Sequence, residues 1–278
     1  MWRRELLRLY TLFYIIHNEM NQYSHTFTVT CQDMNKDYRL SPHAVLLYFQ
    51  ESYARFMGCL NMAAFDLVKE RRMWIITEMS AEMMPVDTFW GDDIVVTIWV
   101  SEITPLRVYA DYRVTNADTG VMIARGSSCW NLMNADTRKL DDTAIVAPRI
   151  TAVPELMLGT HKKIRFPKDG EVLKRVNHTV NQLDLDFNGH VNNRSYVNIA
   201  MLTVPDEFIV THRTRSFTVH WLRETYLGET LTCTLYGLPD GTYMHKLTRT
   251  DGTVAAEILS VWEPLTSTVD VSEVAKRR

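Results

Sequence analysis

The sequence predicts an α+β protein in which a unit of one helix and one antiparallel sheet occurs twice, with the two sheets paired edge to edge. A strand, a helix and then several strands follow one another from Thr26, and the same order returns after about residue 170. The strand segments alternate apolar and polar side chains, as half-buried strands do. A repeat of this size indicates duplicated domains, and pairing their sheets would cover edges that are otherwise exposed.

The first unit begins with an alternating strand at residues 27–31. A helix is predicted over 43–61, because Ser41 is a suitable N-cap, Pro42 suits the first helical position, and apolar residues then recur at helical spacing. The turn residues 116–120 separate two long alternating runs and predict a hairpin. The strands expected after the helix are 73–77, 93–100, 106–115 and 121–131.

The second unit repeats this plan in shorter form. Tyr226-Leu-Gly-Glu229 parallels Phe89-Trp-Gly-Asp92, and Trp262 takes the place of Trp130. A short helix is expected at 191–201. The strands expected in this unit are 172–180, 215–220, 230–236, 243–249 and 254–262.

These patterns divide the chain into five segments. The regular pattern fails after residue 135, where prolines and the basic cluster 161–165 indicate a linker. Leu6–Ile16 is nearly apolar, but it is too short for a membrane span and no cleavage site follows it. We therefore expect a surface helix, or an upstream extension of a gene that starts at Met20. The segments are an N-terminal extension (1–22), a first domain (23–140), a linker (141–169), a second domain (170–265) and a tail (266–278).

Composition excludes several classes of function. A formal net charge of −3 argues against a nucleic-acid binder. The four cysteines are widely spaced, which predicts neither disulfides nor a zinc site but buried thiols in a reducing cytoplasm. We find no phosphate loop, dinucleotide fingerprint or metal cluster, and expect no cofactor and no stable membrane insertion.

The densest polar cluster lies between a predicted strand and the second helix. Asp186, Asn188 and His190 are spaced by two, so an extended segment would point them to one side. Free backbone N–H groups at the start of a helix could stabilise a carbonyl oxygen that gains negative charge. Asp and Asn are also common in turns and caps, so the cluster by itself leaves a structural role open.

Asp186-Phe-Asn188-Gly-His190-Val-Asn-Asn193 resembles the signature of hot-dog thioesterases, in the form found in the plant plastid acyl-[acyl carrier protein] (acyl-ACP) thioesterases and their bacterial relatives. Motifs in the first half resemble the same family in the same order, namely Trp74–Met79, Thr88–Asp92, Val96–Val100, Asp118–Gly120 and Arg125–Trp130. The resemblance covers residues 26–264. It implies two tandem hot-dog domains, each a helix wrapped by an antiparallel sheet, and hydrolysis of fatty acyl-ACP in fatty acid biosynthesis.

The resemblance also implies roles for residues of the second half. Asp186, Asn188 and His190 match the catalytic trio of the family, and Glu224 matches an acidic residue on a later strand. Many plant members have cysteine after that acid, whereas this chain has Thr225, which argues against a cysteine nucleophile. We expect Cys233, eight residues further on, to lie in the core.

Two mechanisms remain open without a thiol. Asp186 can attack the thioester and form an anhydride, or Asp186 or Glu224 can act as general base for water. In both, Asn188 holds the carbonyl or the water, and His190 transfers protons.

The first half is expected to be catalytically silent, because our alignment places Arg39 and Ser41 opposite Asn188 and His190. Its helix and strands are expected to line an acyl tunnel, with candidates Met57, Met62, Trp74, Ile76 and Met79, although each of these residues can equally fill the core. The expected partner is the acidic acyl carrier protein. A basic surface for it would contain Lys162, Lys163, Arg165, Lys174, Arg175, Arg213 and Arg215.

Other functions of the same fold stay open. An acyl-CoA thioesterase would differ mainly in its partner surface, and a non-catalytic acyl-binding regulator would bind acyl chains without turnover. A dehydratase would place a histidine and an acid differently, and that pattern is absent from the sequence. The internal duplication mimics a hot-dog dimer, so the protein can be a monomer or a homodimer.

Overall fold

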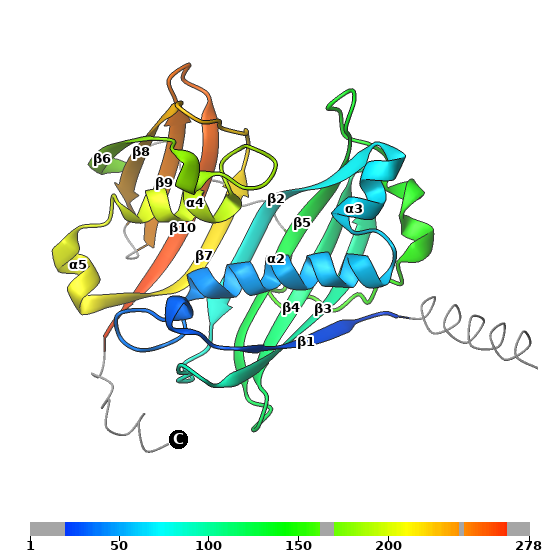
Figure 1. The fold of residues 1–278 in the computed structure, drawn as a ribbon. Coiled ribbons are helices and arrows are strands. Elements are labelled where there is room, and N and C mark those ends of the chain that lie inside the picture. Colours follow the sequence, from blue (N-terminus) through cyan, green and yellow to red (C-terminus); the bar gives the residue numbers. More distant parts are fainter. Residues whose placement is uncertain (1–19, 162–169, 239–241, 266–278) are drawn as a thin grey trace, which may run out of the picture.

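Residues 20–161, 170–238 and 242–265 are described by a computed structural model of the chain. Their strands form one antiparallel sheet in the order β1-β3-β4-β5-β2-β7-β10-β9-β8-β6 (Figure 1). The strands are β1 (Tyr23–Thr28), β2 (Arg72–Met83), β3 (Asp93–Thr104), β4 (Arg107–Asn116), β5 (Met122–Asn134), β6 (Glu171–Thr179), β7 (His212–Trp221), β8 (Thr230–Gly237), β9 (Thr242–Arg249) and β10 (Val254–Pro264).

The two halves meet where β2 pairs with β7, from Glu78 opposite His220 to Glu82 opposite Ser216. The predicted edge-to-edge pairing of two sheets is therefore confirmed. Helix α2 (Pro42–Cys59) lies across the first half of the sheet, and α4 (Asn193–Met201) lies on the same face of the second half (Figure 1). Two shorter helices, α3 (Ala64–Leu67) and α5 (Asp206–Thr211), each lie between the long helix of their half and the strand that follows.

Helix α2 begins as predicted, because the Ser41 hydroxyl accepts a hydrogen bond of 3.1 Å from the Ala44 amide and Pro42 follows the cap. The helix lies close to the sheet at Gly126. A Cβ atom at that position would come within 2.3 Å of the Phe49 ring, so only glycine permits this approach. One turn later, Tyr53 stacks on Trp130 with ring centroids 3.9 Å apart.

Several element boundaries differ from the predictions, and three of the differences have local reasons. Strand β1 starts at Tyr23, and Cys31 already belongs to a 3-10 helix. Strand β2 is much longer than 73–77, because its register shifts between Ile76 and Glu78 and this bulge interrupts the alternation. Helix α4 starts two residues late, because the Asn192 side chain caps it. The short helices α3 and α5 were not predicted.

The linker contains two short 3-10 helices and then crosses the face of the sheet that points away from α2. There the Val153 amide donates to Val100 O at 2.8 Å, and the Trp99 indole donates to Glu155 O at 2.9 Å. The linker thereby covers Trp99, which is fully buried. The N-terminal extension up to residue 19, linker residues 162–169 and the tail lie outside the described residues.

Helices in the described ranges are all too short or too polar to cross a lipid bilayer.

Candidate active site

The polar cluster of the second half forms a tight turn between a 3-10 helix (Gln182–Asp184) and α4. The Asp186 amide donates to His190 O at 2.9 Å, and the Gly189 amide donates to Asp186 O at 3.1 Å. Gly189 has φ 81°, a left-handed conformation that glycine adopts without strain. The expectation of an extended segment was therefore wrong, and the chain reversal itself brings the ends of the cluster together.

The turn places an imidazole between two carboxylates. Asp186 Oδ2 lies 3.5 Å from His190 Nδ1, and Glu224 Oε1 lies 3.8 Å from His190 Nε2. Asn188 joins the group, since its backbone N–H donates to Asp186 Oδ1 at 2.8 Å and its side-chain Nδ2 donates to Asp186 Oδ2 at 3.4 Å. The four residues expected from the resemblance are thus neighbours, and the histidine has an acid on each side.

Glu224 lies in the segment after β7 and not within a strand. Its Oε2 accepts a hydrogen bond of 2.7 Å from the Tyr226 hydroxyl, and both carboxylate oxygens accept from the Arg138 guanidinium. Partial burial raises the pKa of Glu224, but the bonds from Tyr226 and Arg138, together with the charges of Arg138 and His190, outweigh burial and hold that pKa below its ordinary value. Glu224 is therefore ionised at neutral pH.

Sequence reasoning missed both partners of Glu224. Tyr226 had a weak signal, because the motif Tyr226-Leu-Gly-Glu229 has phenylalanine, without a hydroxyl, at the matching position of the first half. Arg138 had none, because it lies 86 residues from Glu224 in the other half of the chain.

The start of α4 offers fewer free donors than expected. The Asn192 side chain accepts a hydrogen bond of 2.9 Å from the Arg194 amide, and Asn192 O accepts one of 2.8 Å from the Ser195 amide. An oxyanion site made of those two amides is therefore ruled out. The Asn188 side chain carries a polar hydrogen beside Asp186 on this side of the turn.

No thiol lies in this group. Thr225 is fully buried, and its hydroxyl accepts a hydrogen bond of 3.1 Å from Tyr196. Cys233 is buried in β8, where burial raises the pKa of its thiol to about 12, so its predicted core position is confirmed. In the ranges that the structure describes, no three His, Cys, Asp or Glu side chains are grouped to hold a metal ion.

The first half contains the same turn with different side chains, and the predicted alignment was wrong by two residues. The Asn35 amide donates to Arg39 O, and Tyr38 takes the left-handed position of Gly189. The Leu40 amide donates to Thr88 O, as the Val191 amide donates to Thr225 O. In the first half, the residues equivalent to Asp186, Asn188, His190 and Glu224 are therefore Asn35, Asp37, Arg39 and Asp87, in that order.

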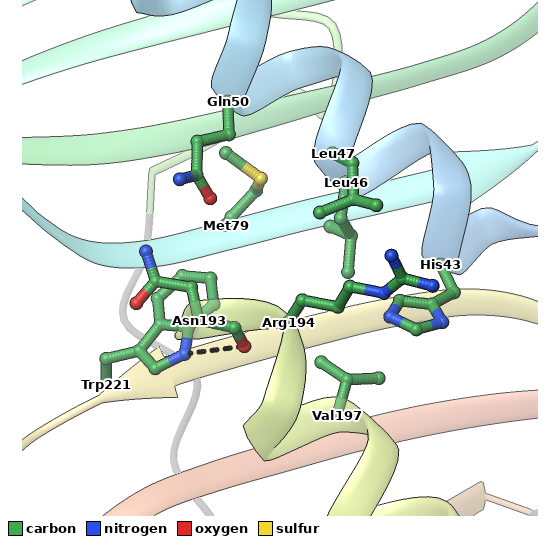
Figure 2. Close-up of a pocket in the computed structure, with 9 residues that line it drawn as sticks. All are labelled: His43, Leu46, Leu47, Gln50, Met79, Asn193, Arg194, Val197 and Trp221. Atoms are coloured by element: carbon green, nitrogen blue, oxygen red, sulfur yellow. Dashed lines mark hydrogen bonds between the residues drawn. The ribbon is translucent and has the colours of Figure 1, made fainter. Parts of the chain in front are cut away.

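A pocket lies between the two long helices, above the seam of β2 and β7 (Figure 2). Trp221 closes one side, and its indole donates to Asn193 O at 3.3 Å. Burial, followed by the charge of Arg194, lowers the pKa of His43 to about 4, so His43 adds no charge at neutral pH. The lining residues are His43, Leu46, Leu47, Gln50, Met79, Asn193, Arg194, Val197 and Trp221.

Only Met79 of the five expected tunnel residues lines this pocket. Met57 and Met62 are fully buried, Ile76 is buried, and the Trp74 indole donates to Met62 O at 2.9 Å. These four residues belong to the core of α2 and the sheet.

The expected basic surface is not continuous. Lys174 and Arg175 lie on the edge strand β6, and three strands separate them from Arg213 and Arg215 on β7. Arg213 is also paired with Glu263 at 2.6 Å. The other three expected members, Lys162, Lys163 and Arg165, lie outside the described residues.

Comparison with known proteins identifies a family. A sequence model described as the acyl-ACP thioesterase N-terminal domain matches residues 20–149, and one described as the C-terminal domain matches residues 168–264. Together the two models cover most of the chain.

Two curated plant relatives agree with these matches. The chain is 24% identical over 258 residues to the chloroplastic acyl-[acyl-carrier-protein] hydrolase FATB1 of Cuphea viscosissima, covering 86% of this chain and 61% of the relative. It is 28% identical over 223 residues to the chloroplastic dodecanoyl-[acyl-carrier-protein] hydrolase of Umbellularia californica, covering 72% of this chain and 55% of the relative. The chain thus spans little more than half the length of these relatives.

Solved structures show the same fold. The 12:0-ACP thioesterase from Umbellularia californica superposes with a TM-score of 0.75 at 22% identity, covering 88% of this chain and 98% of that one. An acyl-ACP thioesterase from Bacteroides thetaiotaomicron superposes with a TM-score of 0.73 at 19% identity, covering 88% of this chain and 99% of that one. With its two matched domains, its ordered motifs and its double hot-dog fold, the chain belongs to the acyl-ACP thioesterase family.

Proposed function

We propose that the protein hydrolyses the thioester of fatty acyl-ACP and releases a free fatty acid, which ends chain elongation in fatty acid biosynthesis. The observation that carries this proposal is His190 flanked by the carboxylates of Asp186 and Glu224. An imidazole beside two acids, with the Asn188 amide next to them, supplies a base or nucleophile, a proton donor and a polar hydrogen for the carbonyl oxygen.

Two reaction schemes use these groups. In the first, an Asp186 oxygen attacks the carbonyl carbon, the carbon–sulfur bond breaks, and water then hydrolyses the mixed anhydride. In the second, Asp186 or Glu224 removes a proton from water as the water attacks the carbonyl. In both, His190 is placed to deliver a proton to the departing sulfur, and Asn188 to stabilise the carbonyl oxygen.

The two halves divide the work in this proposal. The first half is non-catalytic and holds the acyl chain, while the second half carries the reacting groups. The small pocket between α2 and α4 marks where an acyl chain could enter between the halves, because it lies beside Asn193, three residues after His190. Met79→Trp would fill the pocket from β2, and we expect it to shift preference toward shorter chains.

The proposed partner is the acyl carrier protein, and the proposed location is the cytoplasm, where the buried free thiols of Cys129 and Cys233 would remain reduced. A monomer and a homodimer both fit, because β2 and β7 already make within one chain the sheet pairing of two hot-dog units. Sedimentation at several protein concentrations would distinguish the two states.

The decisive experiment measures free acid released from acyl-ACP substrates of graded chain length, with Asp186→Ala and His190→Ala as controls. We expect turnover by the wild type and loss of it in both variants. Unchanged activity in the two variants would end the site assignment. Faster release from acyl-CoA than from acyl-ACP would identify a CoA thioesterase, and binding of acyl chains without turnover would identify a regulator.

A further inference from the structure

Arg138 comes from the first half of the molecule but ends in the candidate active site of the second. It follows β5, in a tight turn of residues 134–139 that leads toward the linker. The Arg138 guanidinium crosses to the segment after β7 and donates to both carboxylate oxygens of Glu224. This is a contact between the two halves at the reacting groups themselves.

The turn that carries Arg138 is held by a dense set of hydrogen bonds. Asn134 Oδ1 accepts from the amides of Asp136 and Thr137 at 3.1 and 2.9 Å, and the Arg138 amide donates to Asn134 O at 3.0 Å. Arg138 itself has φ 56°, a left-handed conformation that is unfavourable for a residue with a side chain. The surrounding bonds therefore fix the direction in which its side chain leaves the turn.

The Arg138 contact limits how Glu224 can lie relative to His190. The Arg138 Nη2 group donates to both oxygens of the carboxylate, which limits its rotation more than a bond to one oxygen would. The Tyr226 hydroxyl holds Oε2 at 2.7 Å, which leaves Oε1 on the side of His190, 3.8 Å from Nε2. Without Arg138, the flexible glutamate side chain could rotate away from the imidazole.

We propose that Arg138 is a positioning residue of the reaction, which holds the Glu224 carboxylate toward His190 and makes the site complete only when the two halves are joined. This inference rests on the proposed function and deepens it. Arg138 acts through Glu224 and does not itself contact the reacting atoms.

Other charged or titratable groups also face Glu224, and they define what Arg138 adds. Arg249 of β9 approaches the Glu224 backbone oxygen at 3.5 Å and pairs with Glu229, so its charge is already shared. Of the arginines and lysines that the structure describes, Arg138 is the one that contacts the Glu224 carboxylate directly. The groups around Glu224 are Arg138, His190, Tyr196, Tyr226, Glu229 and Arg249, with Asp186 beyond His190.

The test compares Arg138→Gln with Arg71→Gln in acyl-ACP hydrolysis. Arg71 is the matched control, because it pairs with Asp136 of the same turn but at the exposed surface. We expect Arg138→Gln to lower kcat by about 10- to 100-fold with KM changed by about twofold or less, because misplacing a reacting group affects the transition state. The acid limb of its kcat/KM profile should move to higher pH, and Arg138→Lys should fall between it and the wild type.

A double-mutant cycle tests whether Arg138 acts through Glu224. In a Glu224→Gln background, Arg138→Gln should cause no further loss of kcat. If the two losses multiplied, or if Arg138→Gln behaved like Arg71→Gln with an unmoved acid limb, the positioning role would be wrong.

A readout without substrate separates this inference from the proposed function. An NMR titration of ¹³C-labelled glutamate side chains, with Glu224 assigned from Glu224→Gln, should show a higher Glu224 pKa in folded Arg138→Gln than in the wild type. An unchanged pKa overturns the inference even if the enzyme is active. A raised pKa in a protein that releases no acid from any acyl-ACP supports the hold of Arg138 on Glu224 and overturns the proposed function alone.

Discussion

Residues 33–41 and residues 184–192 form the same hydrogen-bonded turn, one before each long helix. In the second turn, His190 faces Glu224 and Asp186. In the first, Arg39 forms an ion pair with Asp87. The turn thus keeps the same backbone path and an acidic partner in both halves, while the residue opposite the acid is a histidine in one half and a permanently charged arginine in the other.

The first turn uses its charges for contact between the halves. Asp37 is nearly buried, 3.6 Å from Arg39 and 3.8 Å from Arg213 on β7. Lys36 donates to the backbone oxygen of Ile209, which lies in α5 of the second half. The same turn can therefore gather an acid, an amide and a base, or form a structural contact. Which of the two it does depends on the side chains at its three equivalent polar positions.

The largest expected difference between the turns is in catalysis at their last polar position. His190→Gln should lower kcat by about 10³-fold, because it removes the proposed proton-transfer group. Arg39→Gln, at the equivalent position, should leave kcat within about twofold of the wild type. Free-acid release under saturating acyl-ACP measures both, and equal losses in the two variants would refute the assignment of chemistry to the second half alone.

A smaller effect separates activity from stability at the position two residues earlier. Asn188→Ala should lower kcat by about 10²-fold, because it removes the proposed donor to the carbonyl oxygen. Its melting temperature should hardly change, since the side chain is exposed.

The equivalent change in the first turn should lower stability and leave activity unchanged. Asp37→Ala should retain kcat but lower the free energy of unfolding by about 1–3 kcal/mol, because it removes a buried carboxylate between two guanidinium groups. Thermal unfolding measures the loss, and Asp37→Asn isolates the charge. A loss of kcat in Asp37→Ala with unchanged stability would contradict the proposed division.

The duplication was predictable from sequence because it repeats short motifs that each have a physical cause. In both halves a residue at the same offset, Asp92 or Glu229, accepts a bond from a backbone amide three residues earlier. The register of the two turns was not predictable. It is set by hydrogen bonds from Leu40 to Thr88 and from Val191 to Thr225, two threonines in the segments after β2 and β7, which leave no local pattern.

Part of the candidate site was likewise predictable from sequence, and part was not. Asp186, Asn188 and His190 are close in sequence, so their motif could be recognised. Arg138 reaches Glu224 only because β2 and β7 join the halves, and no spacing within the sequence encodes that contact. The tunnel residues stay a prediction for a different reason: apolar side chains such as Met57 and Met62, both buried, look alike in sequence whether they line a tunnel or fill a core.

The two cores differ at one more pair of equivalent positions. Tyr112 on β4 shares a hydrogen bond of 2.7 Å with Ser128, which also accepts from Trp130. In the second half, His245 on β9 lies 3.0 Å from Ser260, which accepts from Trp262 in the same way. Burial lowers the pKa of His245 to about 3, whereas burial raises the pKa of Tyr112 and keeps it neutral.

This difference predicts that His245 gives the second half an acid sensitivity that the first half lacks. The unfolded chain binds a proton on His245 below about pH 6.5, but the folded protein binds it only near pH 3. The stability due to the neutral histidine is therefore complete above about pH 6.5 and falls by up to about 1.4 kcal/mol per pH unit down to about pH 3. Thermal unfolding between pH 7 and 4 should show a shallower slope in His245→Gln than in the wild type. Tyr112→Phe, which removes only the matching hydroxyl and costs about 1 kcal/mol at every pH, should keep the wild-type slope, and a wild-type slope in His245→Gln would show that other groups cause the acid sensitivity.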